Sequence, residues 1–310
     1  MSRHLQLSRK ISLDKGWDVI VAGGGPAGCA AATAAAREGA KTLLLEATGA
    51  LGGMSTQGLV PKLFGYSDHK QIIARGLAER VRQALGAHDP VIRDALKTNP
   101  LLSPAIDPEF LKRVYDDLVL QAGAEIRFHS QLCGIEKSAR DTVGALLVSD
   151  KTGLRAYQAR IYVDCTGDGD LAAWAGAPFE KGDAEGRLQP ATHCFIVTNI
   201  DEAEYVRGPR IHFTDPKSPI HKGIRSGKYP LIRDRHSCAN RLGPGAMGFN
   251  TGHLFGVDNT DPASLSSALV EGRKMAAQYQ DCFAAYVPAF ANAFLALTGP
   301  LMGIRETRRI

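Results

Sequence analysis

Three glycines and one acid near the N-terminus have the spacing of a dinucleotide-binding site. Gly23, Gly25 and Gly28 fit the pattern G-x-G-x-x-G, and Glu46 ends the next apolar run. In this pattern the first glycine permits a sharp turn, the second lets backbone approach a pyrophosphate, and the third lets a helix pack closely on a strand. An acid about 20 residues further on binds a ribose 2′-hydroxyl. The spacing therefore predicts dinucleotide binding, although an ordinary strand–helix–strand unit with a glycine turn is the alternative.

The segments around these glycines must hold them in place, and they read as a βαβ unit. Residues 18–22 are a short apolar run rich in β-branched residues, as in a buried parallel strand. Pro26 and Ala27 open the following helix, where the missing N–H of proline costs little. The N–H groups and dipole of that helix are expected to face the phosphates. Residues 41–45 form the second strand.

A second glycine-rich loop directly follows the second strand. Gly52 and Gly53 allow backbone to approach a ligand closely, and Met54 comes next. Ser55 and Thr56 offer hydroxyl donors. A plain surface loop is the alternative. Two glycine clusters at neighbouring strand ends favour the ligand-binding interpretation.

The middle of the chain continues the alternation of helices and strands. Residues 71–85 have helical apolar spacing, and residues 86–104 are rich in Pro, Asn and Asp and are expected to include a mobile loop. A further helix starts at Asp107-Pro108-Glu109, and residues 125–129 predict a third parallel strand. Residues 132–163 alternate as an antiparallel ribbon.

The last ribbon strand runs into the turn C-T-G-D-G-D and then a short helix at residues 171–176. Ligands in open α/β sheets bind at such carboxyl ends. Residues 180–262 lack the βαβ rhythm and predict a separate mixed domain, and residues 264–283 return to helical spacing. The uncharged stretch 284–302 contains Pro288 and other breakers, which argue for a buried helix rather than a membrane span.

Composition and charge exclude several classes of protein. With 310 residues, 44% hydrophobic and 22% charged, the chain is typical of a soluble globular protein of about two domains. The net charge of +5 is concentrated in residues 1–16, which we expect to be a flexible basic tail. The rest lacks a basic stripe interleaved with aromatics, so nucleic acid is not an expected partner.

The cysteines and the N-terminus indicate in which compartment of the cell the protein is expected. Six cysteines are widely spread and none forms C-x-x-C, so no metal site is expected. Free thiols fit a reducing cytosol, and the N-terminus lacks the apolar segment of a signal peptide. A cytoplasmic protein with no membrane partner is therefore predicted.

Four segments together resemble the FAD-dependent oxidoreductases of the glutathione-reductase structural type. These segments are VAGGGPAGCAAATAAAREGAKTLLLE, LGGMST, VDCTGDGDLAAWAG and GIRETRRI. The resemblance implies an α/β fold with a doubly wound, Rossmann-like FAD-binding domain, an antiparallel β-ribbon insertion, and a mixed α+β substrate or cover domain. The expected boundaries are 17–178 for the FAD-binding domain, with a helical insertion at about 66–118. The cover domain is expected at 179–300, with 301–310 starting the return to the first domain.

The resemblance also assigns roles to residues. Gly23, Gly25 and Gly28, with Pro26 and Ala27, would hold the FAD pyrophosphate, and Glu46 the adenosine ribose. The loop Gly52, Gly53, Met54, Ser55 and Thr56 would lie along the flavin end. Thr166, Gly167 and Asp168 would pass close to the adenosine or pyrophosphate.

The implied activity is transfer of a hydride from a small organic substrate to the flavin. Arg305, Arg308 and Arg309 are candidates for anchoring an anionic substrate, because guanidinium suits carboxylates. Helix-terminal charges paired with Glu306 are the alternative.

Three histidines can act as a base near neutral pH, namely His193, His236 and His253, although a structural role is the alternative for each. Asn250 and Asp258 can hydrogen-bond a substrate or stabilise a turn-rich loop.

Members of this family continue past the GIRETRRI segment, so the resemblance implies that a chain ending at Ile310 is truncated. A catalytically incomplete nucleotide-binding remnant is therefore the first alternative to an enzyme. A flavoprotein that modifies transfer RNA is a weaker one, because basic patches are missing and the LGGMST loop argues against it.

Overall fold

The computed structural model describes residues 8, 10–305 and 307–310, which form two compact units. The first unit contains the chain up to Gly49, residues 118–178 and Ile310, and the second contains residues 50–117 and 179–309. The expected helical insertion therefore groups with the second unit. The functional domain boundaries given above stay a prediction.

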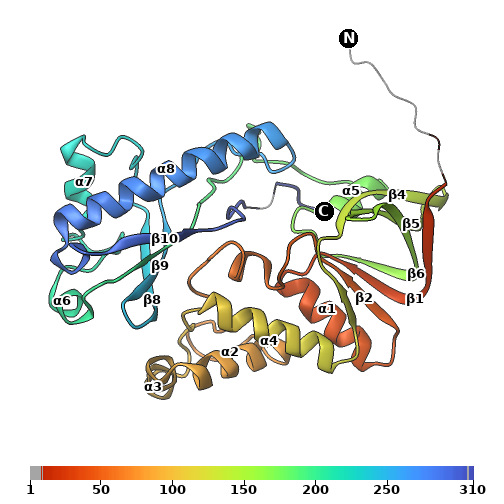
Figure 1. The fold of residues 1–310 in the computed structure, drawn as a ribbon, viewed down its shortest axis with the longest axis horizontal. Coiled ribbons are helices and arrows are strands. Elements are labelled where there is room, and N and C mark those ends of the chain that lie inside the picture. The colour runs from red at the N-terminus through yellow and green to blue at the C-terminus, as the bar shows by residue number, and fades with distance from the viewer. Residues whose placement is uncertain (1–7, 9, 306) are drawn as a thin grey trace, which may run out of the picture. The chain divides into compact units, whose positions relative to one another are not determined.

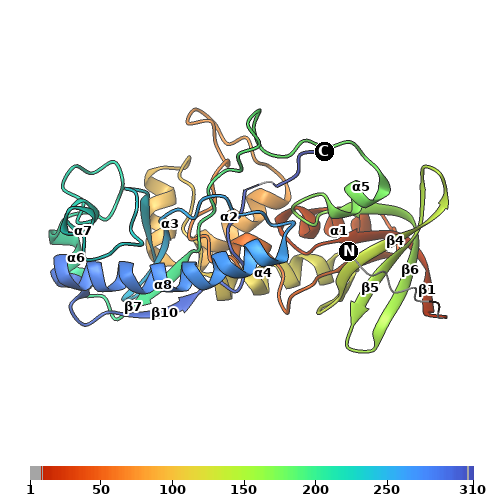
Figure 2. The same ribbon diagram turned by 90° about the horizontal axis from the view of Figure 1, so that it is seen from above.

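The first unit is built on a six-stranded sheet with the order β3-β2-β1-β6-β5-β4 (Figure 1). Its strands are β1 (Ser12–Ala22), β2 (Thr42–Leu45), β3 (Glu125–Arg127), β4 (Gln131–Ala139), β5 (Thr142–Asp150) and β6 (Gly153–Asp164). The pairs β1–β2, β2–β3 and β1–β6 are parallel, whereas β4, β5 and β6 form an antiparallel ribbon (Figure 2). The predicted α/β sheet, third parallel strand and ribbon are confirmed.

The first strand is longer than its apolar run indicates. Residues 12–16, expected within a flexible tail, belong to β1; Ser12 to Asp14 pair with Arg155 to Tyr157 of β6, and the register shifts between Asp14 and Trp17. The indole N–H of Trp17 donates to Asp14 at 3.0 Å. Cross-strand pairing thus orders a polar segment that the apolar pattern alone does not reveal. Residues 1–7 and 9 of the expected tail lie outside the described residues.

Two helices complete the first unit, α1 (Pro26–Arg37) and α5 (Asp170–Ala175). The helix α1 connects the parallel strands β1 and β2, as in a βαβ unit. A core cluster of this unit joins residues of β1, β2, the ribbon and α5, and its buried members are Trp17, Ile20, Ala22, Leu43, Leu45, Leu132, Leu146, Val148, Tyr157 and Leu171.

The second unit carries a four-stranded antiparallel sheet with the order β10-β7-β9-β8. Its elements are η1 (Gly53–Ser55), α2 (Leu77–His88), α3 (Pro90–Thr98), β7 (Phe195–Thr198), α6 (Glu202–Arg207), α7 (Ile220–Ser226), β8 (Ser237–Gly243), β9 (Ala246–Thr251), α8 (Pro262–Tyr286), η2 (Pro288–Phe290) and β10 (Phe294–Thr298). Helix α4 (Pro108–Gln121) belongs to the second unit up to Asp117 and to the first from Leu118. The long helix α8 runs beside this sheet (Figure 1), and buried aromatic rings such as Phe195, Phe249 and Phe283 fill the space between them.

Aspartate followed by proline begins three of these helices. The side chain of Asp89 accepts from the N–H of Val91, and that of Asp261 accepts from the N–H of Ala263, at the starts of α3 and α8. Asp107 does the same for α4. The segment 86–104, expected to include a mobile loop, is helical over Pro90–Thr98, because the Asp89 cap and a proline at the first helical position start α3 there.

Two further expectations differ from the structure. Helix α2 begins at Leu77 rather than at residue 71, because Asp68 binds the N–H groups of Lys70 and Gln71 in a turn and Gly76 has a φ of 64°. The stretch 284–302, expected as a buried helix, instead contains the end of α8, η2 and the edge strand β10. Pro288 follows the end of α8 by two residues and holds Val287 in extended backbone, which stops the helix.

Candidate functional site

The turn between β1 and α1 is built from backbone atoms that leave no room for side chains. Gly23 has a φ of 100°, and a Cβ there would lie 2.2 Å from the carbonyl oxygen of Cys165. A Cβ on Gly28 would lie 1.8 Å from the carbonyl oxygen of Gly23. Both contacts are far inside van der Waals distance, so the tight turn and the close helix require glycine at these positions.

Gly25 differs from its two neighbours because it faces open space. Its φ and ψ of −66° and −179° are ordinary for any residue, and a Cβ there would meet nothing within 4 Å. It is the N-cap of α1 and lacks a side-chain cap, with Pro26 at the first helical position. The first N–H groups of a helix have no partner inside it, so those of Ala27 and Gly28 are free to bind an anion. The residues present therefore fit a pyrophosphate.

Glu46 lies beside the turn, and its carboxylate can accept one more hydrogen bond than it does here. It is 8% exposed, and its Oε2 accepts from the N–H of Gly24 at 2.6 Å. Its Oε1 accepts from the N–H and the hydroxyl of Thr48, both at 2.7 Å. A carboxylate has about four acceptor positions, so Oε2 can accept a ribose hydroxyl as well.

The second turn of the first unit is organised by Asp164, a residue that sequence reasoning did not single out. Its Oδ1 accepts from the N–H and hydroxyl of Thr166 at 3.0 and 2.8 Å, and its Oδ2 accepts from the N–H of Ala172 at 2.8 Å. Gly167 has a φ of 94° with open space at its Cβ position, and Asp168 is buried. The acid at the end of a strand before a glycine turn was the signal that could have identified Asp164.

The glycine loop after β2 is held by its own hydroxyl groups. Gly52 has a φ of 100° and precedes the short helix η1. The Ser55 hydroxyl donates to the Gly52 carbonyl at 2.7 Å, and the Thr56 hydroxyl donates to the Leu51 carbonyl at 2.6 Å. These hydroxyls therefore stabilise the loop, and contact of the loop with the flavin stays a prediction.

Two of the three candidate histidines lie together in the second unit. The rings of His236 and His253 stack at 4.2 Å with an angle of 8°. The Nδ1 of His253 lies 3.1 Å from the Oδ2 of Asp234, and the Oδ1 of Asp234 accepts from the N–H of His236. Burial lowers the pKa of His236, and the nearby charges of His253 and, more weakly, Arg305 act in the same direction. The sequence did not indicate Asp234, because an acid 19 residues from a histidine carries no signal.

The third histidine has the surroundings of a structural group. His193 is 1% exposed, and its Nε2 lies 2.7 Å from the Gly299 carbonyl oxygen. A Cβ on Gly272 of α8 would lie 2.4 Å from its Nδ1, so the ring is tightly enclosed. Burial lowers the pKa of His193, which keeps the ring neutral and packed between α8 and the segment after β10.

The arginines of the final segment lie in three different environments. Arg305 is exposed, whereas the Arg308 guanidinium lies 5.5 Å from the Phe179 ring centroid. Arg309 binds Glu180 at 3.0 Å and the Gly182 carbonyl at 3.0 Å. The predicted partner Glu306 lies outside the described residues.

The predicted substrate groups Asn250 and Asp258 also separate. Asn250 lines a pocket beside β9, whereas Asp258 binds Lys181 at 2.6 Å and the Thr260 hydroxyl at 2.6 Å. Asp258 therefore stabilises a turn, and Asn250 is accessible to a ligand.

The profile of the family described as FAD dependent oxidoreductase matches residues 18–310. The chain belongs to this family. It is an oxidoreductase, and FAD is its cofactor. The geometry of the glycine turn and Glu46 suits the adenosine diphosphate part of that molecule.

Solved structures of low sequence identity share the fold. L-proline dehydrogenase from P. horikoshii superposes with a TM-score of 0.51 at 13% identity, covering 92% of this chain and 80% of that one. The p-nitrophenol 4-monooxygenase PnpA from Pseudomonas putida DLL-E4 gives 0.51 at 13%, covering 94% and 68%. BexE, which takes part in oxidation during BE-7585A biosynthesis, gives 0.51 at 14%, covering 94% of this chain and 53% of its own length. The chain thus spans about half of BexE and four-fifths of the dehydrogenase.

Two further findings concern membranes and metals. No helix within residues 8, 10–305 and 307–310 combines the length and apolar character of a membrane span. The same residues hold no group of three or more His, Cys, Asp or Glu side chains placed to bind a metal ion.

Proposed function

We propose that this protein oxidises a small organic substrate by transferring a hydride from a substrate C–H bond to FAD. Bound FAD supplies the hydride acceptor, while the chain binds it and orients the substrate. The observation that carries the proposal is the space at Gly25, which lies between two glycines fixed by backbone contacts. The 310 residues hold no second G-x-G-x-x-G after a strand, which favours the substrate rather than NAD(P)H as the hydride donor.

We assign His253 as the base that takes the substrate proton, with Asp234 as its positioning residue. The contact between Nδ1 and the Asp234 carboxylate fixes the proton on Nδ1, so the lone pair of Nε2 can accept a proton. The stacked ring of His236 holds the orientation of His253.

An exposed guanidinium suits an anionic group on the substrate, and we assign this anchoring role to Arg305. Arg308, which packs on Phe179, is the second candidate.

The visible spectrum of the purified chain with added FAD tests cofactor binding. We expect a flavin spectrum that bleaches on anaerobic addition of dithionite. Gly25→Val should lose the flavin and keep its thermal unfolding temperature, because a Cβ at this position meets no protein atom within 4 Å. Gly243→Ala is the matched control, since its Cβ also meets nothing within 4 Å. A wild-type chain that takes up no FAD, or a Gly25→Val variant that binds it normally, contradicts the proposal.

Anaerobic mixing with small alcohols, amines and hydroxy acids tests the hydride donor. Bleaching of the flavin by one of these compounds without nicotinamide cofactor is the expected result. It should slow when the reacting C–H is replaced by C–D. Bleaching by NAD(P)H alone contradicts the proposed reaction.

A further inference from the structure

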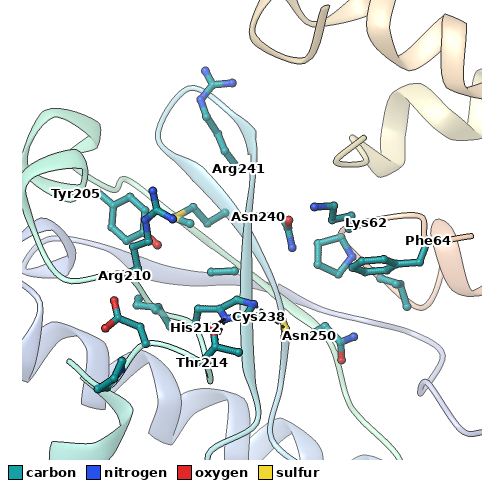
Figure 3. Close-up of a pocket in the computed structure, with 17 residues that line it drawn as sticks. Lys62, Phe64, Tyr205, Arg210, His212, Thr214, Cys238, Asn240, Arg241 and Asn250 are labelled. Atoms are coloured by element: carbon teal, nitrogen blue, oxygen red, sulfur yellow. Dashed lines mark hydrogen bonds between the residues drawn. The ribbon is translucent and has the colours of Figure 1, made fainter. Parts of the chain in front are cut away.

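The second unit contains a pocket that none of the assignments above explains. It has a volume of about 740 Å³, and residues from a loop at 60–64, the segment 205–216, β8 and β9 line it. Figure 3 shows Lys62 and Phe64 on one side and Cys238 and Asn240 on the strand facing them. The volume falls within the range of about 300–1,000 Å³ that is typical of small-molecule sites.

The charges around this pocket leave it electropositive. Arg241 is neutralised by Asp89 at 3.1 Å and Glu202 at 2.8 Å. Lys62 and Arg210, by contrast, are in no salt bridge with any residue that the structure describes. Asp215 is the only acid among the lining residues, and its Oδ1 accepts from the N–H of Lys217. Two cations thus face one acid, which favours an anionic ligand.

Neutral donors and an aromatic ring accompany these cations. The side-chain amides of Asn240 and Asn250 form no hydrogen bond within the described part of the chain, so both can donate to a ligand. The Phe64 ring is 79% exposed, and the Lys62 ammonium lies 5.4 Å from its centroid. An exposed aromatic ring beside an unpaired cation suits a ligand that is flat and apolar at one end and charged at the other.

The facing wall of the pocket carries a thiol next to a histidine. Cys238 Sγ lies 3.9 Å from His212 Nε2, and the Nδ1 of that ring lies 2.7 Å from the Thr214 hydroxyl. Cys238 and Asn240 are two residues apart on β8, so both side chains point to the same face of the sheet. Burial raises the pKa of the Cys238 thiol, so it reacts slowly but remains half-exposed to the pocket.

We propose that this pocket binds a small organic carboxylate with a planar apolar body. Lys62 pairs with the carboxylate, Asn240 and Asn250 donate hydrogen bonds to it, and Phe64 covers the flat part of the ligand. Binding itself is independent of the reaction proposed above. The statement that this carboxylate is the substrate rests on that proposed function, and it makes Lys62 rather than Arg305 the anchor of the anionic group, because Arg305 does not line the pocket.

Protection of Cys238 from iodoacetamide measures occupancy of the pocket directly. The full chain with FAD is alkylated at a fixed alkaline pH with benzoate, phenylacetate or cinnamate at millimolar concentrations, and peptide masses give the rate at each cysteine. We expect each acid to slow alkylation of Cys238 about fivefold or more relative to its neutral amide, since the charged contact is worth more than a neutral one. The exposed Cys133 is the internal control and should react at an unchanged rate.

Two lysine variants separate a specific contact from general charge. Lys62→Met should raise the carboxylate concentration that gives half-maximal protection about tenfold, a loss of about 1.4 kcal/mol in binding. The matched variant Lys70→Met removes an exposed lysine outside the pocket and should change nothing. The proposal is overturned if the acids protect no better than the amides or than sulfate, if Lys62→Met keeps the protection, or if Cys238 is not alkylated without a ligand.

The substrate role has its own readout. The pocket is the substrate site if hydroxy or amino acids that protect Cys238 also bleach the flavin, and if Lys62→Met raises the KM for these compounds. If the acids protect Cys238 but no acid reduces the flavin, the carboxylate pocket stands and its substrate role is overturned. A protein that binds no FAD contradicts the proposed function and leaves the protection result unaffected.

Discussion

The glycine turn of the first unit and the pocket of the second are built in opposite ways. In the turn, backbone atoms of Gly23 and Gly28 touch other backbone, and the ligand space at Gly25 is defined by a missing side chain. In the pocket, Lys62, Phe64 and the amides of β8 and β9 come from segments far apart in the sequence. A backbone-built site leaves a short local pattern, whereas a side-chain site depends on the tertiary fold. The first kind is shared by many relatives, and the second can differ between proteins of the same fold.

The largest effect expected from this contrast is a loss of stability in the turn. Gly28→Ala places a Cβ 1.8 Å from the Gly23 carbonyl, and we expect it to lower the free energy of unfolding by about 3 kcal/mol. Gly25→Ala is the matched control and should change it by less than about 0.5 kcal/mol. Urea unfolding followed by circular dichroism measures both, and equal effects would remove the distinction between the two glycines.

The second prediction concerns the histidine pair, which is a side-chain site. His253→Gln should lower kcat about 100-fold with little change in KM or in flavin content, because it removes the proposed base. Asp234→Asn should lower kcat about tenfold, and Asp234→Glu should restore part of the loss because the carboxylate contact is kept. Steady-state kinetics with the substrate found by flavin bleaching checks this. An unchanged kcat in His253→Gln would exclude the histidine as the base.

A third prediction returns to the backbone-built site and its one acidic side chain. Glu46→Gln should raise the Kd for FAD about tenfold, because an amide NH₂ cannot accept both a ribose hydroxyl and the N–H of Gly24. Flavin fluorescence titration measures the Kd. Asp168→Asn, beside the second turn, tests whether loss of any nearby carboxylate raises the Kd for FAD. We expect a smaller rise in Kd for this variant than for Glu46→Gln.

The fourth prediction is a pH dependence of stability. Burial lowers the pKa of His193 and His236 in the folded state, so the unfolded chain binds protons more readily as the pH falls below about 6.5. The free energy of unfolding should therefore be constant above that pH and decrease below it. His193→Gln should flatten part of the decrease in urea titrations at several pH values, and a slope of the opposite sign would contradict the neutral state.

The smallest expected effect belongs to the exposed pair of Arg309 and Glu180. Both side chains are largely exposed, so Arg309→Ala should cost less than about 1 kcal/mol in thermal unfolding. Flavin content should stay unchanged. A loss of flavin or of activity would place Arg309 with the substrate-anchoring groups instead.

The parts of the fold that local sequence patterns specify could be predicted, whereas those that depend on distant segments could not. Periodic apolar runs and glycine turns predicted the βαβ unit, the third strand and the ribbon, because each follows from local patterns. Asp89 and Pro90 together are a typical start of a helix, but the polar composition of residues 86–104 favoured a loop and α3 was not predicted. The extension of β1 to Ser12 could not be predicted from the sequence. This segment is ordered by its pairing with β6 and has no apolar pattern of its own.

The sites divide in the same way. The positions of Gly23, Gly25, Gly28 and Glu46 followed from spacing alone. The pairing of Asp234 with His253 could not be predicted from spacing, and neither could the position of Lys62 opposite Asn240. In both cases the residues come together from strands and loops that are distant in the sequence. Six cysteines gave no pattern, and yet one of them lies against a histidine in the pocket.

The contact between Gly23 and Cys165 also sets an order of assembly during synthesis. The first βαβ segment leaves the ribosome early, but the wall of its turn belongs to the end of β6, which is made much later. Until then β1 lacks its central partner, and an apolar strand edge stays open to other chains. Because pairing between segments so distant in the sequence is slow, we expect the N-terminal part to be prone to aggregation until β6 has been made.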